Sequence, residues 1–143
     1  MLLDHRFPIR VRLRLVAGVA VLAATFASSA AYASPSIGVA NDPNNGTILA
    51  DDRGMTVYKY TVDQPNTSTC YEGCASAWPP VLADAVPQVM DPSLTAGIGI
   101  APRNDGTQQV TYLGAPLYYF IGDTQPGNTT GQGQDGIWFV VNP

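Results

Sequence analysis

The sequence predicts a mainly β protein in which two tandem copies of a short-strand repeat pack as one domain, with one short disulfide-stapled helical turn. Residues 44–81 align with residues 104–141 without a gap, with ten identical pairs in 38 positions. Chance would give roughly 6–7% identity per position. The apolar runs are short and bounded by Gly, Pro, Asn or Asp. Asn45-Gly46 and Asp105-Gly106 occupy equivalent places in the two copies, and both dipeptides favour tight hairpin turns.

We expect residues 1–33 to form a signal peptide that is cleaved after Ala33. Arginines precede an apolar run, Leu15 to Phe26, and Ala31-Tyr32-Ala33 places small residues where a signal peptidase reads them. The apolar run is shorter than the roughly 20 residues of a membrane-spanning helix. No cysteine near the cleavage site offers a lipid attachment point. The sequence therefore predicts an exported protein, periplasmic or extracellular, with no stable membrane anchor after leader removal.

The predicted mature domain, residues 34–143, is acidic. It carries three basic against ten acidic residues, a net charge of −7. This balance argues against nucleic acid or an anionic membrane as a partner. The only histidine, His5, leaves with the leader, which excludes a Ser-His-Asp triad and a His-ligated zinc or copper site. We expect no metal site and no cofactor, and a cell-envelope component is the candidate partner.

Seven short strands are predicted along the mature chain. They span residues Ile37–Ala40, Thr47–Ala50, Thr56–Thr61, Gly97–Ala101, Gln109–Leu113, Pro116–Ile121 and Ile137–Val141. Small residues from Cys70 to Trp78 predict one helical turn, which Pro79-Pro80 ends. Residues 81–92 have the composition of an extended connector, and residues 124–136 that of a polar surface loop.

Cys70 and Cys74 are the only cysteines, and an oxidising compartment favours a disulfide between them. The three-residue spacer differs from the two-residue spacing of thioredoxin-like motifs, which weakens a redox-active alternative. Two thiolates without a histidine are also a poor zinc site. We therefore interpret the pair as a staple for the helical turn.

Two equivalent segments, residues 58–63 and 118–123, share the pattern of a tyrosine, an aromatic residue two positions later and an aspartate five positions later. On a strand, the tyrosine and the second aromatic residue share a face, and the aspartate falls just past the strand end. With the segment from Cys70 to Pro80 and the stretch from Gly131 to Trp138, the chain resembles a family of secreted bacterial repeat proteins with a Y-x4-D motif. These are also described as predicted lipoproteins with a Yx(FWY)xxD motif, and their function is unassigned.

The duplication favours a structural interpretation of the motif, because folding constraints act on both copies whereas an active site needs only one. Six aromatic residues are expected to form the core between the copies: Tyr58, Tyr60, Trp78, Tyr118, Phe120 and Trp138. Asp63 and Asp123 are expected to cap turns by accepting backbone N–H bonds. The predicted function is that of a non-catalytic cell-envelope or extracellular module, structural or binding.

Three alternatives stay open. Tyr71, Tyr119 and Asn128 could bind sugar rings or peptide of the cell envelope. Four aspartates could gather oxygen ligands for calcium, although no spaced ligand loop is present: Asp51, Asp52, Asp63 and Asp123. Asp63 and Asp123 could also act as the acid and base of a glycoside hydrolase.

Overall fold

The structure is a computed structural model that describes residues 33–143. The predicted leader, residues 1–33, lies outside the described residues except for Ala33. No helix within residues 33–143 has the length and apolar character that crossing a membrane requires.

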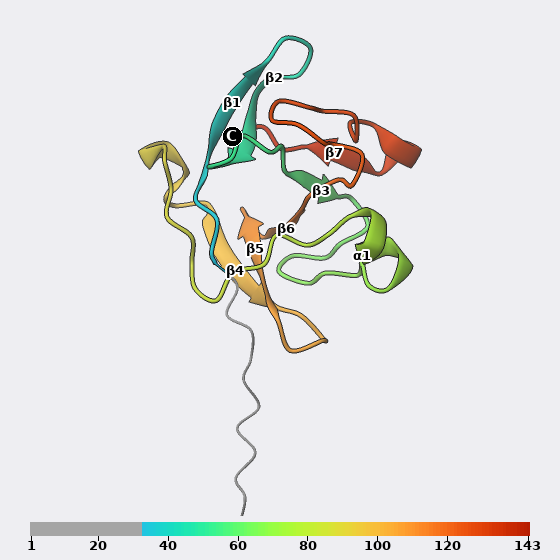
Figure 1. Cartoon of the computed structure of the whole chain (residues 1–143). Helices are drawn as coiled ribbons and strands as arrows, with labels where there is room; N and C mark the ends of the chain where they lie inside the picture. The colour runs from blue at the N-terminus through green and yellow to red at the C-terminus, as the bar shows by residue number, and fades with distance from the viewer. Residues whose placement is uncertain (1–32) are drawn as a thin grey trace, which may run out of the picture.

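Residues 33–143 form seven strands and three short helical segments (Figure 1), and the predicted mainly β class is confirmed. The strands are β1 Ile37–Asp42, β2 Gly46–Asp51, β3 Tyr58–Tyr60, β4 Ile98–Pro102, β5 Gln108–Tyr112, β6 Ala115–Tyr118 and β7 Trp138–Val140. The helical segments are α1 Gly73–Ala77 and the 3-10 turns η1 Pro92–Leu94 and η2 Gln134–Gly136.

Three of the predicted strands are too long, and the expected strand Ile137–Val141 shortens to Trp138–Val140. The expected strand from Thr56 begins only at Tyr58, because Thr56 forms a single bridge with Ala50. The expected strand to Ile121 ends at Tyr118, because the next residues bond to the α1 region instead, with the Ile121 N–H donating to the Ala77 carbonyl. Phe120 therefore lies outside β6, and the expectation that it shares a strand face with Tyr118 is wrong.

Strands from the two copies interleave in one sheet. β1 and β2 form a two-stranded antiparallel hairpin, and the larger sheet has the order β4-β5-β6-β3-β7. The first-copy strand β3 thus lies between β6 and β7 of the second copy. Tyr58 is opposite Tyr118 on one side and Val140 on the other. Neither copy supplies the five-stranded sheet alone.

The two predicted hairpin turns join β1 to β2 and β4 to β5. Gly46 and Gly106 adopt φ values of +75° and +84°, which only glycine reaches without strain. Asp42 accepts hydrogen bonds from the backbone N–H groups of Asn44 and Asn45, and Asp105 accepts one from Thr107. The Asn-Gly and Asp-Gly signals therefore marked both turns correctly.

The sheet region is buried on both sides. Adjacent β6 residues Leu117 and Tyr118 fall in two different clusters, since neighbouring strand residues point to opposite faces. One cluster is mainly aliphatic and contains Ile37, Leu49, Val57, Val81, Ala83, Leu94, Ile98, Val110, Tyr112, Leu117 and Val141. The other is rich in aromatic rings and contains Ile48, Tyr58, Cys70, Trp78, Tyr118, Trp138 and Val140, with Tyr60 and Phe120 packed against it.

The predicted disulfide is confirmed. Cys70 and Cys74 are bonded, and Cys74 lies in the single turn of α1. Cys70 is fully buried in the aromatic cluster. The staple therefore holds the helical turn that brings Trp78 into the core.

Candidate functional site

Each motif tyrosine donates its hydroxyl proton to the motif aspartate of the other copy. Tyr58 Oη lies 2.5 Å from Asp123 Oδ2, and Tyr118 Oη lies 2.6 Å from Asp63 Oδ2. Distances in this range are typical of charge-assisted hydrogen bonds, which are stronger than neutral ones. The two copies are therefore connected by the same bond in both directions.

The second oxygen of each aspartate orders the loop that follows it. Asp63 Oδ1 accepts the backbone N–H and the hydroxyl of Thr69 at 2.7 and 2.8 Å. Asp123 Oδ1 accepts the same two groups of Thr130 at 2.9 and 2.5 Å. The sequence predicted the local backbone bonds but not the tyrosine partners. Each carboxylate accepts three hydrogen bonds, and Asp123 is only 6% exposed.

The loop that follows each motif aspartate also contacts the opposite copy, at the turn that contains Gly54 or Gly114. The Gly127 N–H donates to the Gly54 carbonyl at 3.0 Å, and the Asn66 N–H donates to the Gly114 carbonyl at 2.7 Å. Gly54 and Gly114 are equivalent under the 60-residue offset. The loop after each motif aspartate is thus held on the other copy by one side-chain hydrogen bond and one backbone hydrogen bond.

Four aromatic rings form a continuous stack in which the copies alternate. Trp78 and Trp138 lie parallel with centroids 4.0 Å apart. Tyr60 stacks on Trp138 at 4.2 Å, and Phe120 stacks on Trp78 at 4.3 Å. The two tryptophans are buried and the two end rings are half-buried. We refer to these four residues as the ring stack.

The motif tyrosines meet the ring stack edge-on. The Tyr58 centroid lies 5.3 Å from Trp78, and the Tyr118 centroid lies 5.2 Å from Trp138. Burial raises the pKa of both tyrosines far above the ordinary value of 10.0, and the carboxylates of Asp123 and Asp63 raise it further. Both phenols are therefore neutral at any physiological pH.

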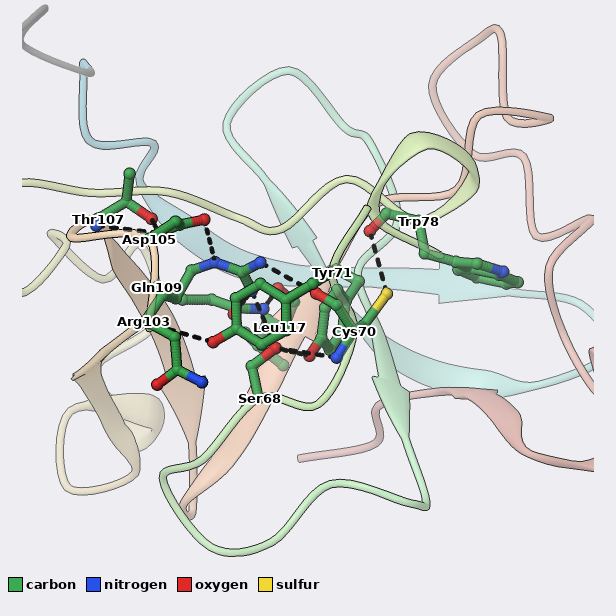
Figure 2. Close-up of polar contacts among 11 residues, drawn as sticks. Ser68, Cys70, Tyr71, Trp78, Arg103, Asp105, Thr107, Gln109 and Leu117 are labelled. Atoms are coloured by element: carbon green, nitrogen blue, oxygen red, sulfur yellow. Dashed lines mark hydrogen bonds and ion pairs between the residues drawn. The ribbon is translucent and has the colours of Figure 1, made fainter. Parts of the chain in front are cut away.

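The sequence interpretation missed Arg103, a buried residue of the second copy that donates hydrogen bonds to several groups. Its guanidinium donates to Ser68 Oγ at 2.9 Å, to Gln109 Oε1 at 2.6 Å and to the Cys70 carbonyl at 2.9 Å (Figure 2). Ser68 in turn lies 2.7 Å from the Tyr118 hydroxyl. The only available signal was that Arg103 is one of three basic residues among residues 34–143.

Asp51 is a buried residue of the first copy that accepts several hydrogen bonds. It is 2% exposed and accepts hydrogen bonds from the Arg53 side chain, from the backbone N–H groups of Arg53 and Met55, and from the Tyr119 hydroxyl. Burial, followed by the Asp51 charge, raises the pKa of Tyr119. Three of the four aspartates considered for calcium, Asp51, Asp63 and Asp123, each serve a separate internal network and do not form one cluster. Within residues 33–143, no three His, Cys, Asp or Glu side chains gather to hold a metal ion.

The residues considered for ligand binding use their polar groups locally. The ring of Tyr71 lies under the Arg103 guanidinium at 4.3 Å, and its hydroxyl accepts the Asn104 N–H. The Asn128 side-chain oxygen accepts the N–H groups of Thr124 and Gln125. Tyr119 is the one of the three that lines the larger of two described cavities.

That cavity has a volume of about 440 Å³. It is lined by Ala33, Ser34, Pro35, Asp52, Arg53, Pro80, Leu82 and Tyr119. A smaller cavity of about 190 Å³ lies beside Tyr60 and Asp63, at one end of the ring stack. Neither contains Tyr71 or Asn128, so the three candidate binding residues do not share a groove.

The repeat is also found by comparison with known proteins. A family described as "Secreted repeat of unknown function" matches residues 39–82 and again residues 99–142. No curated protein and no solved structure is similar enough to the chain to count as a match. The two matched segments are related by the same 60-residue offset as the internal duplication, and together they cover more than half of the chain. The chain therefore belongs to this family of secreted repeats of unknown function and carries two copies of the repeat.

Proposed function

We propose that this exported protein is a non-catalytic structural or binding module of the periplasm or cell exterior, whose two copies fold as one unit. The observation that supports this most strongly is the reciprocal exchange of tyrosine hydroxyls and aspartate carboxylates between the copies. The motif residues are thereby used to join the copies. A residue used in this way must be kept in both copies whether or not the protein binds anything.

The hydrogen bonds that the carboxylates of Asp63 and Asp123 already accept argue against the hydrolase alternative. A glycosidase needs one carboxyl group to protonate the leaving oxygen and a second to attack or activate water. Asp63 and Asp123 each accept three hydrogen bonds from the protein itself, and two of these come from a neighbouring threonine. Either reaction would require these bonds to break first.

The proposal is tested by incubating the purified mature protein with isolated bacterial cell walls. We expect no release of soluble sugar fragments, whether or not the protein sediments with the walls. Asp63→Asn and Asp123→Asn variants are compared by unfolding in urea, because the proposal predicts that both lose stability. Release of fragments that disappears in a folded Asp123→Asn variant would overturn the proposal.

Ligand binding at the Tyr119 cavity is a second candidate. Its volume falls within the range of small-molecule sites, and it combines apolar walls with the charged groups of Arg53 and Asp52. A cell-wall oligosaccharide titrated into the labelled protein should then shift NMR signals of Tyr119 and Leu82 but not of Tyr71. Unchanged signals around the cavity would remove this candidate and leave the structural role.

A further inference from the structure

The ring stack has the geometry of a path for single electrons. Its four rings are in van der Waals contact, with successive centroid distances of 4.2, 4.0 and 4.3 Å. The two end rings, Tyr60 and Phe120, are half-buried and reach solvent, while Trp78 and Trp138 are buried. Indole and phenol rings give up one electron more readily than most side chains. An oxidising equivalent that arrives at Tyr60 can therefore pass to the buried indoles, whereas the benzene ring of Phe120 is too hard to oxidise to act as an entry point.

Proton acceptors lie beside the two central rings of the stack. Tyr58 and Tyr118 each contact one indole edge-on, and each donates a short hydrogen bond to a carboxylate. A phenol that loses an electron becomes strongly acidic, so its proton moves to a base that is already hydrogen-bonded to it. The high pKa of both tyrosines keeps that proton in place until the electron has left.

We propose that the ring stack and its tyrosine–aspartate pairs form a one-electron relay that holds an oxidising equivalent as a neutral tyrosyl radical, chiefly on Tyr58. A one-electron oxidant in solution takes an electron from the stack, and Tyr58 refills the Trp78 radical cation. The Tyr58 O–H bond breaks, and its proton forms a new O–H bond on Asp123 Oδ2. The products are the reduced oxidant, a neutral tyrosyl radical and a neutral aspartic acid, so electrons, protons and charge balance.

The two tyrosines are not equivalent, because a cation lies behind only one of them. Ser68 lies within hydrogen-bond distance of the Tyr118 hydroxyl, and the buried guanidinium of Arg103 donates to Ser68 at 2.9 Å. Arg103 is ion-paired with Asp105 at 3.3 Å, but the Asp105 side chain is 47% exposed, so solvent screens its charge more than that of the guanidinium. The remaining positive field makes removal of an electron nearby less favourable. The Tyr58 hydroxyl accepts only the Gly131 N–H, at 3.2 Å. Tyr58 is therefore the favoured site.

The test uses photogenerated ruthenium(III) tris(bipyridine) as the oxidant and the mature protein as the electron donor. Transient absorption and electron paramagnetic resonance should show a tyrosyl radical that forms more slowly in D2O than in H2O. Tyr58→Phe should lose most of this signal. Tyr119→Phe is the matched control, since Tyr119 also donates to a carboxylate, Asp51, at 3.0 Å but lies outside the ring stack. The control should keep the wild-type yield.

The outcomes are decisive in either direction. A wild-type tyrosyl yield in folded Tyr58→Phe, or a loss of the signal in Tyr119→Phe, would overturn the relay. The D2O comparison uses the unaltered chain, so equal rates in the two solvents overturn the relay even when Tyr58→Phe does not fold. Oxidation that stops at tryptophan, or that proceeds equally fast in both solvents, would reject proton transfer to Asp123. These results do not depend on the cell-wall assay, so the relay and the proposed function can fail separately.

Discussion

The reciprocal hydrogen bonds predict a specific loss of stability for Tyr58→Phe. The substitution keeps the ring and its edge-on contact with Trp78, and removes only the oxygen that donates to Asp123 and accepts the Gly131 N–H. A hydrogen bond to a charged group contributes about 1.5–3 kcal/mol. Asp123 is only 6% exposed, so water cannot readily replace the lost donor. We expect the free energy of unfolding to fall by about 3 kcal/mol.

This loss is large against a total stability of about 5–15 kcal/mol for a natural domain. The measurement is equilibrium unfolding in urea followed by tryptophan fluorescence, because both tryptophans are buried in the folded state. Tyr60→Phe is the matched control. Its ring belongs to the same stack, and its hydroxyl has no hydrogen bond with the residues that the structure describes. The control should change the unfolding free energy by no more than about 0.5 kcal/mol.

A double-mutant cycle separates the pair from its surroundings. Tyr58→Phe and Asp123→Asn are measured alone and together, and the coupling energy reports the direct interaction. We expect a coupling of about 1–3 kcal/mol, as found for residues that share a hydrogen bond. The reasoning is refuted if Tyr58→Phe costs no more than Tyr60→Phe, or if the two changes simply add.

Four further predictions follow from the same contacts. The free energy of unfolding should keep its full value below pH 10 and fall above it by about 1.4 kcal/mol per pH unit for each of Tyr58 and Tyr118, because these phenols ionise at lower pH in the unfolded chain than in the folded one. A urea midpoint that does not change between pH 10 and 11 would contradict this. Gly131→Ala should destabilise the protein, because a Cβ there would lie 2.7 Å from the Trp78 ring, whereas Gly73→Ala should not, since nothing lies within 4 Å. Arg103→Met should cost about 3 kcal/mol or more in urea unfolding, since it leaves several buried acceptors unpaired. Reducing the Cys70–Cys74 disulfide should lower the unfolding free energy by about 2 kcal/mol, and an unchanged thermal midpoint would show that this disulfide contributes nothing to stability.

Much of the fold could be predicted from local signals in the sequence. The offset of 60 residues, the Asn-Gly and Asp-Gly turns and the short apolar runs depend on neighbours in the chain, and these elements were placed correctly. The ends of β3, β6 and β7 were not. β6 ends early because the residues after Tyr118 bond to the α1 region, and no local pattern reveals that partner.

The sequence predicted which residues make up most of the candidate site but not which of them bond to one another. The aromatic residues and Asp63 and Asp123 were identified because they repeat, and repetition is visible in one sequence. The exchange of partners between copies was not visible, since a pattern shows which residues matter but not which copy each one faces. Arg103 occurs once, with Pro43 at the equivalent position, so repetition could not find it.

The central claim is that each copy needs the other to bury its aromatic rings. The most direct measurement compares residues 34–92, residues 93–143 and residues 34–143 by tryptophan fluorescence and circular dichroism. We predict that each half alone is unfolded with a solvent-exposed tryptophan, because its tyrosine, aspartate and stacked ring lose their partners. A half that unfolds cooperatively on its own, with its tryptophan protected from a soluble quencher, would contradict the claim.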